Sequence, residues 1–154
     1  MIRNVLIALA VLAAPLFAGA DVPLTPEDVS RRAKEGIDLV GNDYIRARQA
    51  QNPELLLFDV RSEEEFDLGH IPGAVSVPRG VAEFRISKEV RSADAEIIVY
   101  CATGSRAALV KKALDSQGYR NVSAHEGFDT WAEAGEPVEN EYGKFTLISR
   151  ASAQ

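Results

Sequence analysis

Unbroken apolar runs and amphipathic stretches alternate along most of the chain. The two strongest runs lie at residues 55–60 and 96–100, and both are apolar at nearly every position rather than at alternate ones. This pattern is typical of a strand in a sheet that is covered on both faces. Weaker strand signals occur at residues 37–40, 74–77 and 121–124. We therefore predict a central sheet of buried, mainly parallel strands.

Helix start signals lie between these runs. Thr25 precedes Pro26 and two acidic residues, which predicts an N-capped helix that runs to about residue 35. Ser62 and Glu65 form a capping-box pattern that opens a short helix ending near Gly69. Further helices are predicted at residues 42–51, 81–84, 106–117 and 127–134. Strands that alternate with helices predict an α/β fold in which helices cover both faces of the sheet.

The length of the chain bounds the number of domains. Its 154 residues are enough for one domain with a sizeable core. No internal repeat or low-complexity linker divides the sequence, so residues 21–154 are predicted to form a single domain. The tail at residues 139–154 is the least regular part, and only an added edge strand at 144–148 is predicted there.

The N-terminal segment has the pattern of an export signal. Arg3 precedes an apolar run at residues 5–14, and small residues at positions 18 and 20 form a cleavage pattern. Residues 1–20 are therefore predicted to be a signal peptide, which places the protein outside the cytoplasm, in the periplasm if the source is Gram-negative. The alternative is an uncleaved anchor, but the apolar run is shorter than the roughly twenty residues that span a bilayer. We expect no stable membrane span in the mature form.

Charge and cysteine content narrow the function classes. The net charge is −6, and no basic run longer than a pair occurs, which argues against nucleic acid as a partner. The chain has one cysteine, Cys101, so no internal disulfide is possible. A lone thiol in an oxidising compartment is prone to oxidation. Its presence despite this risk favours a role of the thiol in the protein's chemistry. A buried, inert cysteine is the alternative.

The residues around Cys101 favour a reactive thiol over a buried, inert one. The residue ends the apolar run at 96–100, and four small residues then lead into a helix: Ala102, Thr103, Gly104 and Ser105. Ligands bind at this rim of an open α/β sheet. Backbone N–H groups of such a loop form an anion-binding nest, and the helix N-terminus and Arg106 add positive potential. We therefore expect a thiolate nucleophile that needs no histidine base.

Three blocks of the sequence together resemble a single-domain rhodanese. The first block spans residues 57–66 and 69–74, the second spans 99–106, and the third lies within 127–138. The resemblance covers about residues 55–138 and implies a three-layer rhodanese-like fold. It also implies sulfur transfer from a donor such as thiosulfate onto Cys101, and from that persulfide to cyanide or a thiol. Glu126 departs from the family pattern, which often has glycine at that position.

The resemblance also implies roles for individual groups. The N–H groups of residues 102–106 would hold the persulfide, and Arg106 would help to hold an anionic donor. The partners would be small sulfur-containing anions and thiols, with a partner protein as a further sulfur acceptor. No cofactor is implied. The lead-in at residues 36–53 is longer than is usual in the family.

Other polar residues allow two interpretations. Arg61 either contacts the donor or forms an ion pair with Asp59 that fixes the loop, and we favour the ion pair. His70 is predicted to fix a turn, because no second ligand stands at metal spacing. His125 is a solitary histidine near a strand end. Trp131 is predicted to pack in the core or at its rim.

Two other function classes remain as alternatives. Cysteine-dependent phosphatases and arsenate reductases use the same thiolate-in-a-nest chemistry, but their arginine stands six positions after the cysteine. Here Arg106 stands five positions after Cys101, and Ala107 holds the sixth. The shorter ring should be too tight for phosphate. A non-enzymatic carrier, which holds a persulfide for a dedicated partner, would keep the same loop.

Overall fold

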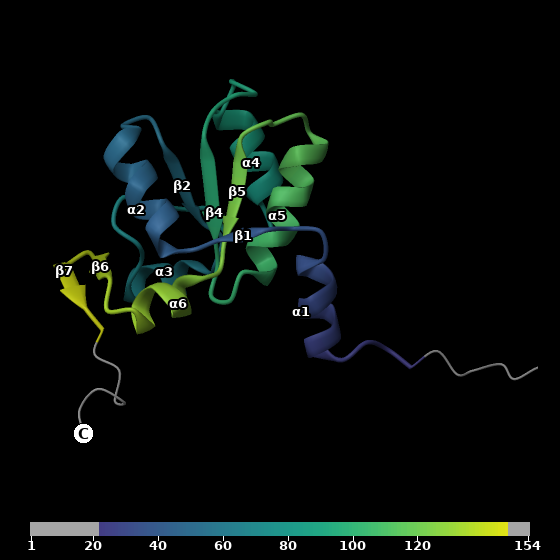
Figure 1. Ribbon diagram of the computed structural model, residues 1–154, viewed down its shortest axis with the longest axis horizontal. Helices are drawn as coiled ribbons and strands as arrows, with labels where there is room; N and C mark the ends of the chain where they lie inside the picture. The colour runs from purple at the N-terminus through teal and green to yellow at the C-terminus, as the bar shows by residue number, and fades with distance from the viewer. Residues whose placement is uncertain (1–21, 148–154) are drawn as a thin grey trace, which may run out of the picture.

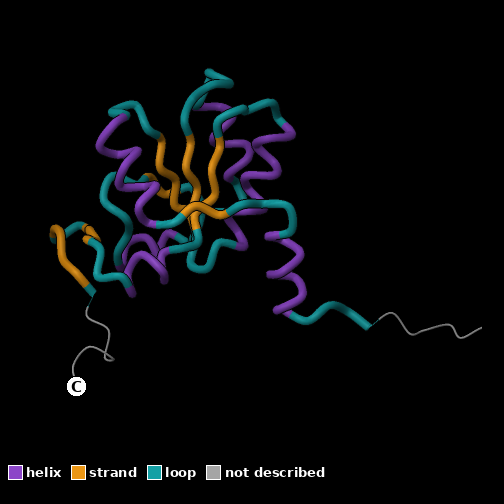
Figure 2. Tube along the Cα trace, in the orientation of Figure 1, coloured by secondary structure: helices purple, strands orange, loops and turns teal. Residues whose placement is uncertain are grey.

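The computed structural model describes residues 22–147, so the predicted signal peptide lies outside the described residues. Five parallel strands form the central sheet in the order β1-β5-β4-β2-β3 (Figures 1 and 2). These strands are β1 (Leu39–Val40), β2 (Leu56–Asp59), β3 (Val75–Ser76), β4 (Ile97–Tyr100) and β5 (Val122–His125). The predicted strands are therefore confirmed, and β4 is the central one.

Within residues 22–147, six helices surround the sheet. They are α1 (Pro26–Lys34), α2 (Asn42–Gln51), α3 (Glu63–Leu68), α4 (Ala82–Glu89), α5 (Ser105–Ser116) and α6 (Phe128–Glu133). Figure 1 shows α4 and α5 on one face of the sheet, and α2 and α6 on the other. The predicted α/β fold with helices on both faces is therefore confirmed. No helix within residues 22–147 is long and apolar enough to cross a membrane.

Alternate residues of β2 and β4 divide the core between these two layers. Phe58 and Val99 face the cluster formed with α4 and α5. Leu57 and Ile98 face the cluster formed with α2 and α6. Because both faces are buried, the strands must be apolar at every position, which is the pattern that the sequence shows.

Local capping signals are present where the sequence predicts them. The Thr25 side chain accepts from the backbone N–H of Asp28 at 3.2 Å. Ser62 and Glu65 form a complete capping box, in which each side chain accepts from the other residue's backbone N–H. The helix predicted at 81–84 extends to Glu89 as α4, because the buried side chain of Ile86 continues its apolar face.

The tail differs from the prediction. Strand β7 (Gly143–Thr146) pairs antiparallel with β6 (Pro137–Asn140) in a separate two-stranded sheet, so the added edge strand predicted at 144–148 is wrong in its pairing. Residue 148 lies outside the described residues. The hairpin is anchored by the backbone of Glu139, which exchanges two hydrogen bonds with His70 at 2.9 and 3.0 Å. Val138 is fully buried against the α2–α6 layer.

Candidate active site

Cys101 stands at the carboxyl end of the central strand and is 1% exposed. The chain turns at once into α5, and we call residues 101–106 the nest loop. Gly104, the N-cap of α5, makes the turn with φ of +83°. A Cβ at this position would also lie 3.0 Å from the carbonyl oxygen of Glu126. The loop therefore needs glycine both for its backbone conformation and for its packing.

Helix α6 fixes the peptide planes of the nest loop. The N–H of Phe128 donates to the carbonyl of Cys101 at 2.7 Å, and the N–H of Asp129 donates to the carbonyl of Ala102 at 3.1 Å. In a trans peptide the N–H points opposite to the C=O. The N–H groups of Ala102 and Thr103 therefore point away from α6.

The loop N–H groups are left without acceptors of their own. Within residues 22–147, no backbone carbonyl accepts from an N–H of residues 102–106. Thr103 is exposed at the tip, whereas Gly104 is buried. Unpaired N–H groups at a helix N-terminus favour an anion. The arrangement can thus stabilise negative charge on the sulfur of Cys101 or on a sulfur bound to it.

Arg106, which the family resemblance assigns to the anionic donor, is held by Glu65. Its two terminal nitrogens donate to the two carboxylate oxygens of Glu65 at 2.9 and 3.0 Å. This hydrogen-bonded arginine lowers the pKa of Glu65 to about 2. Glu65 and, to a smaller extent, Cys101 raise the pKa of Arg106. Arg106 is therefore close to the cysteine, but its charge is balanced by Glu65.

Arg61 and Asp59 form a buried ion pair. The Nε and one terminal nitrogen of Arg61 reach both oxygens of Asp59 at 2.6–3.0 Å. The guanidinium also donates to the carbonyl of Gly69 at 2.7 Å and lies 4.0 Å from the ring centre of Phe128. Because Arg61 is only 5% exposed, this geometry supports the structural interpretation over a donor contact.

His70 contacts the end of α3, as expected for a residue that fixes a turn. Its Nδ1 lies 3.0 Å from the carbonyl oxygen of Phe66, and the two rings stack with centroids 3.7 Å apart. Its Nε2 lies 3.7 Å from a carboxylate oxygen of Glu139. No cluster of three metal-ligating side chains occurs within residues 22–147.

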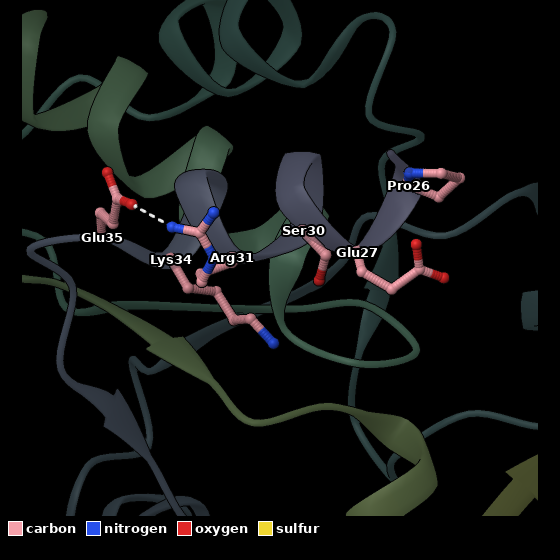
Figure 3. Close-up of a pocket in the computed structure, with 6 residues that line it drawn as sticks. All are labelled: Pro26, Glu27, Ser30, Arg31, Lys34 and Glu35. Atoms are coloured by element: carbon pink, nitrogen blue, oxygen red, sulfur yellow. Dashed lines mark hydrogen bonds and ion pairs between the residues drawn. The ribbon is translucent and has the colours of Figure 1, made fainter. Parts of the chain in front are cut away.

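Helix α1 supports the nest loop from outside. The hydroxyl oxygen of Ser30 lies 2.6 Å from that of Ser105. Ser30 is also one of the α1 residues that line a surface hollow of about 570 Å³. Figure 3 shows these side chains along the helix. This hollow is lined by α1 residues and does not include Cys101. We therefore place the candidate site at the nest loop and not at the hollow.

Three residues at this site were not among those predicted from the sequence. Glu65 was identified only as part of a capping box, and nothing local indicated its contact with Arg106. Gly127 belongs to the third sequence block, and a Cβ there would lie 2.1 Å from the carbonyl oxygen of Ala102. His125 is fully buried and hydrogen-bonded to the N–H of Gly127. The contacts of Glu65 with Arg106 and of Gly127 with Ala102 join segments that are far apart in the sequence, and the contact of His125 depends on the turn that follows β5. Hydrophobic periodicity reveals neither kind of contact.

Comparison with known proteins agrees with this fold. Residues 42–134 match the rhodanese-like domain family, and the chain belongs to that family. An Allochromatium vinosum sulfurtransferase is 28% identical over 103 residues, which cover 66% of this chain and 94% of that protein. The structure of a human single-domain sulfurtransferase is 26% identical, with a TM-score of 0.55 and coverage of 64% and 97%.

Two further relatives carry other descriptions. A Rhodopseudomonas palustris protein of unknown function, described as a possible tyrosine phosphatase, is 28% identical in its structure, with a TM-score of 0.61 and coverage of 77% and 99%. An HTH-type transcriptional regulator from Mycobacterium tuberculosis is 33% identical over 125 residues. The chain spans about half (49%) of that regulator's length. The family is therefore shared by proteins of different overall function.

Proposed function

We propose that this protein is a sulfurtransferase that moves a sulfane sulfur from a donor such as thiosulfate to cyanide or a thiol through a persulfide on Cys101. The observation that supports this most directly is the set of unpaired N–H groups in the nest loop, next to the cysteine. These groups are fixed before any ligand arrives, which is the condition for effective electrostatic stabilisation.

The chemistry takes place in two balanced steps. The Cys101 thiolate attacks the outer sulfur of thiosulfate, a new S–S bond forms, and sulfite leaves with the electron pair of the broken S–S bond. Cyanide or a thiolate then attacks the terminal sulfur of the persulfide, and Cys101 leaves as the thiolate. In both states the nest loop holds a negatively charged sulfur, so the same N–H groups serve both steps.

Arg106 has a defined place in this proposal. Its guanidinium lies at the loop rim and is balanced by Glu65, so it offers donors to an anionic substrate without a large net positive charge. The side chains of Arg106 and Glu65 are 38% and 37% exposed, which leaves them accessible from solvent. Small anionic donors that reach the rim would therefore meet the arginine before the buried cysteine.

The test is thiosulfate:cyanide sulfur transfer by the wild-type protein and the Cys101→Ser variant. We expect the wild type to form thiocyanate and the variant to form none. After incubation with thiosulfate alone, mass spectrometry should show the wild type heavier by one sulfur atom and the variant unchanged. Thiocyanate formation that persists in Cys101→Ser would overturn the proposal.

A persulfide carrier is the second candidate. Cys101 is only 1% exposed, so a persulfide on it would be shielded from solvent until a dedicated partner binds. Turnover separates the two functions. A carrier would load one sulfur in the mass measurement but would not cycle with cyanide or small thiols. We expect no phosphomonoester hydrolysis, because Arg106 closes the loop one residue earlier than in the phosphatases.

We also propose that the protein acts outside the cytoplasm, on the basis of the signal pattern in residues 1–20. Expression of the full chain in a Gram-negative host, followed by N-terminal sequencing of the periplasmic fraction, tests this. We expect a mature protein that begins at Asp21. Uncleaved protein in the membrane fraction would support the anchor instead.

A further inference from the structure

His125 ends β5 and is fully buried. Its Nδ1 lies 3.0 Å from the backbone nitrogen of Gly127, and its Nε2 lies 2.9 Å from Oδ1 of Asn42. A backbone N–H can only donate, so Nδ1 must be the unprotonated nitrogen and Nε2 must donate to Asn42. Asn42 in turn donates its amide N–H to the carbonyl of Thr130 at 3.2 Å, which fixes the orientation of the amide. The neutral Nε2-H tautomer of His125 is therefore defined by its contacts.

The surroundings keep the ring neutral. Burial lowers the pKa of His125 to about 4. The ring is faced by the amide of Asn42 from α2 and by Trp131 from α6, whose ring centroid is 6.4 Å away at an angle of 73°. Near pH 7 the lone pair of Nδ1 is thus available to Gly127.

Gly127 connects this histidine to the nest loop. Three consecutive N–H groups have different partners: Gly127 donates to His125, Phe128 donates to the carbonyl of Cys101, and Asp129 donates to the carbonyl of Ala102. Gly127 also packs so closely that an added Cβ would lie 2.1 Å from the Ala102 oxygen. A shift of Gly127 would therefore move the two donors that orient the loop.

We propose that neutral His125 is a positioning residue for the Cys101 site. By holding the N–H of Gly127, it keeps the start of α6 against the loop carbonyls, and the loop N–H groups stay turned away from α6. The consequence for turnover rests on the proposed sulfurtransferase function, whereas the consequence for the geometry does not. The competing role is that of a core histidine that only stabilises the fold.

Two variants each keep one of the two hydrogen bonds. In His125→Asn, the side-chain oxygen occupies the position of Nδ1 and can accept from the N–H two residues ahead, but it does not reach Asn42. In His125→Gln, the longer side chain reaches Asn42 and leaves the N–H of Gly127 without its acceptor. The pair therefore separates the contact that leads to the loop from the contact that leads to α2.

The first readout is the rate at which iodoacetamide alkylates Cys101 at pH 7. We expect His125→Asn to stay close to wild type and His125→Gln to be slower by about tenfold, by analogy with the loss of residues that orient metal ligands. The rate of sulfur discharge from the preloaded persulfide to cyanide should show the same split. Urea unfolding of both variants provides the stability comparison.

A purely stabilising role predicts that the two rates follow the unfolding free energy, with no separation between the variants at equal stability. That result would overturn the proposal. Alkylation requires no sulfur transfer, so a split in alkylation without any wild-type turnover would keep the positioning role and reject the sulfurtransferase instead.

A measurement on the wild type covers the case in which a variant does not fold. Nitrogen-15 spectra recorded as the pH is lowered should show the amides of Gly127, Ala102 and Thr103 moving with one midpoint near 4, where His125 gains its proton. The other titratable groups beside these amides are Cys101, Glu126 and Asp129, so the same titration is recorded for Glu126→Gln and Asp129→Asn. Movement of the Gly127 amide alone, with the loop amides unchanged, would contradict the coupling.

Discussion

The ion pair between Glu65 and Arg106 gives a stability prediction that can be worked from the structure. Glu65→Gln removes the carboxylate charge but keeps a side-chain oxygen, which can still accept from the N–H of Ser62 in the capping box. The substitution therefore tests the charge and leaves the helix cap in place. Glu63→Gln is the matched control, because Glu63 is an exposed carboxylate in the first turn of the same helix.

The pKa shift of Glu65 sets the magnitude. A fall from 4.5 to about 2 corresponds to roughly 3 kcal/mol at 1.36 kcal/mol per unit. Both side chains are more than a third exposed, at 37% and 38%, so solvent screens the pair. The expected loss of unfolding free energy in Glu65→Gln at pH 7 is therefore about 1 kcal/mol. The control should change by no more than about 0.5 kcal/mol.

The sign of the pH dependence follows from the lowered pKa. The folded protein binds the Glu65 proton less readily than the unfolded chain, so the contribution is full well above pH 4.5 and is lost as the pH falls toward 2. Urea unfolding can be followed by Trp131, the single tryptophan, which is 2% exposed. The gap between wild type and Glu65→Gln should close with acid and shrink in high salt. A gap that is unchanged near pH 2, or one equal to the control's, would refute the reasoning.

Two further substitutions, each with a matched control variant, test close contacts. Gly127→Ala, at φ +132°, should unfold more easily by about 2 kcal/mol or more and lose sulfur transfer, because its Cβ meets a nest-loop oxygen at 2.1 Å. Gly143→Ala, at φ +129° with no neighbour within 4 Å, should carry the backbone strain alone and keep its activity. Tyr100→Phe should cost about 1–3 kcal/mol in urea unfolding, because the buried N–H of Ile71 loses the hydroxyl that it reaches at 3.1 Å. Tyr142→Phe, 88% exposed, should change by less than about 0.5 kcal/mol; an equal loss in both tyrosine variants would contradict this account.

Local signals predicted the elements well because their causes are local. The Thr25 cap and the capping box of Ser62 and Glu65 are hydrogen bonds across three residues, so the sequence pattern contains the whole interaction. The position of Cys101 at a strand end was predictable for the same reason, because its cause is also local. A buried strand must end where its apolar run ends, and the small residues that follow leave no alternative to a tight turn into α5.

The interpretation of Arg61 shows where local reasoning reached its limit. Its proximity to Asp59 was predictable from a separation of two residues, and the ion pair is present. The contact with the carbonyl of Gly69, and the place of the guanidinium over the Phe128 ring, depend on two other segments. Those contacts bury the side chain and favour a structural role over contact with a donor.

Local sequence patterns were enough to predict the α/β class, the order of the elements along the chain and the position of the cysteine at a strand end. The tertiary structure alone decided that Glu65 holds Arg106 across 41 residues and that Asn42 meets His125 across 83. It also decided that the C-terminal hairpin docks on His70 and leaves the main sheet without a sixth strand. Hydrophobic periodicity reports which face of an element is buried, but not which element covers it. Strand order and crossovers supply that information, and they exist only in the folded chain.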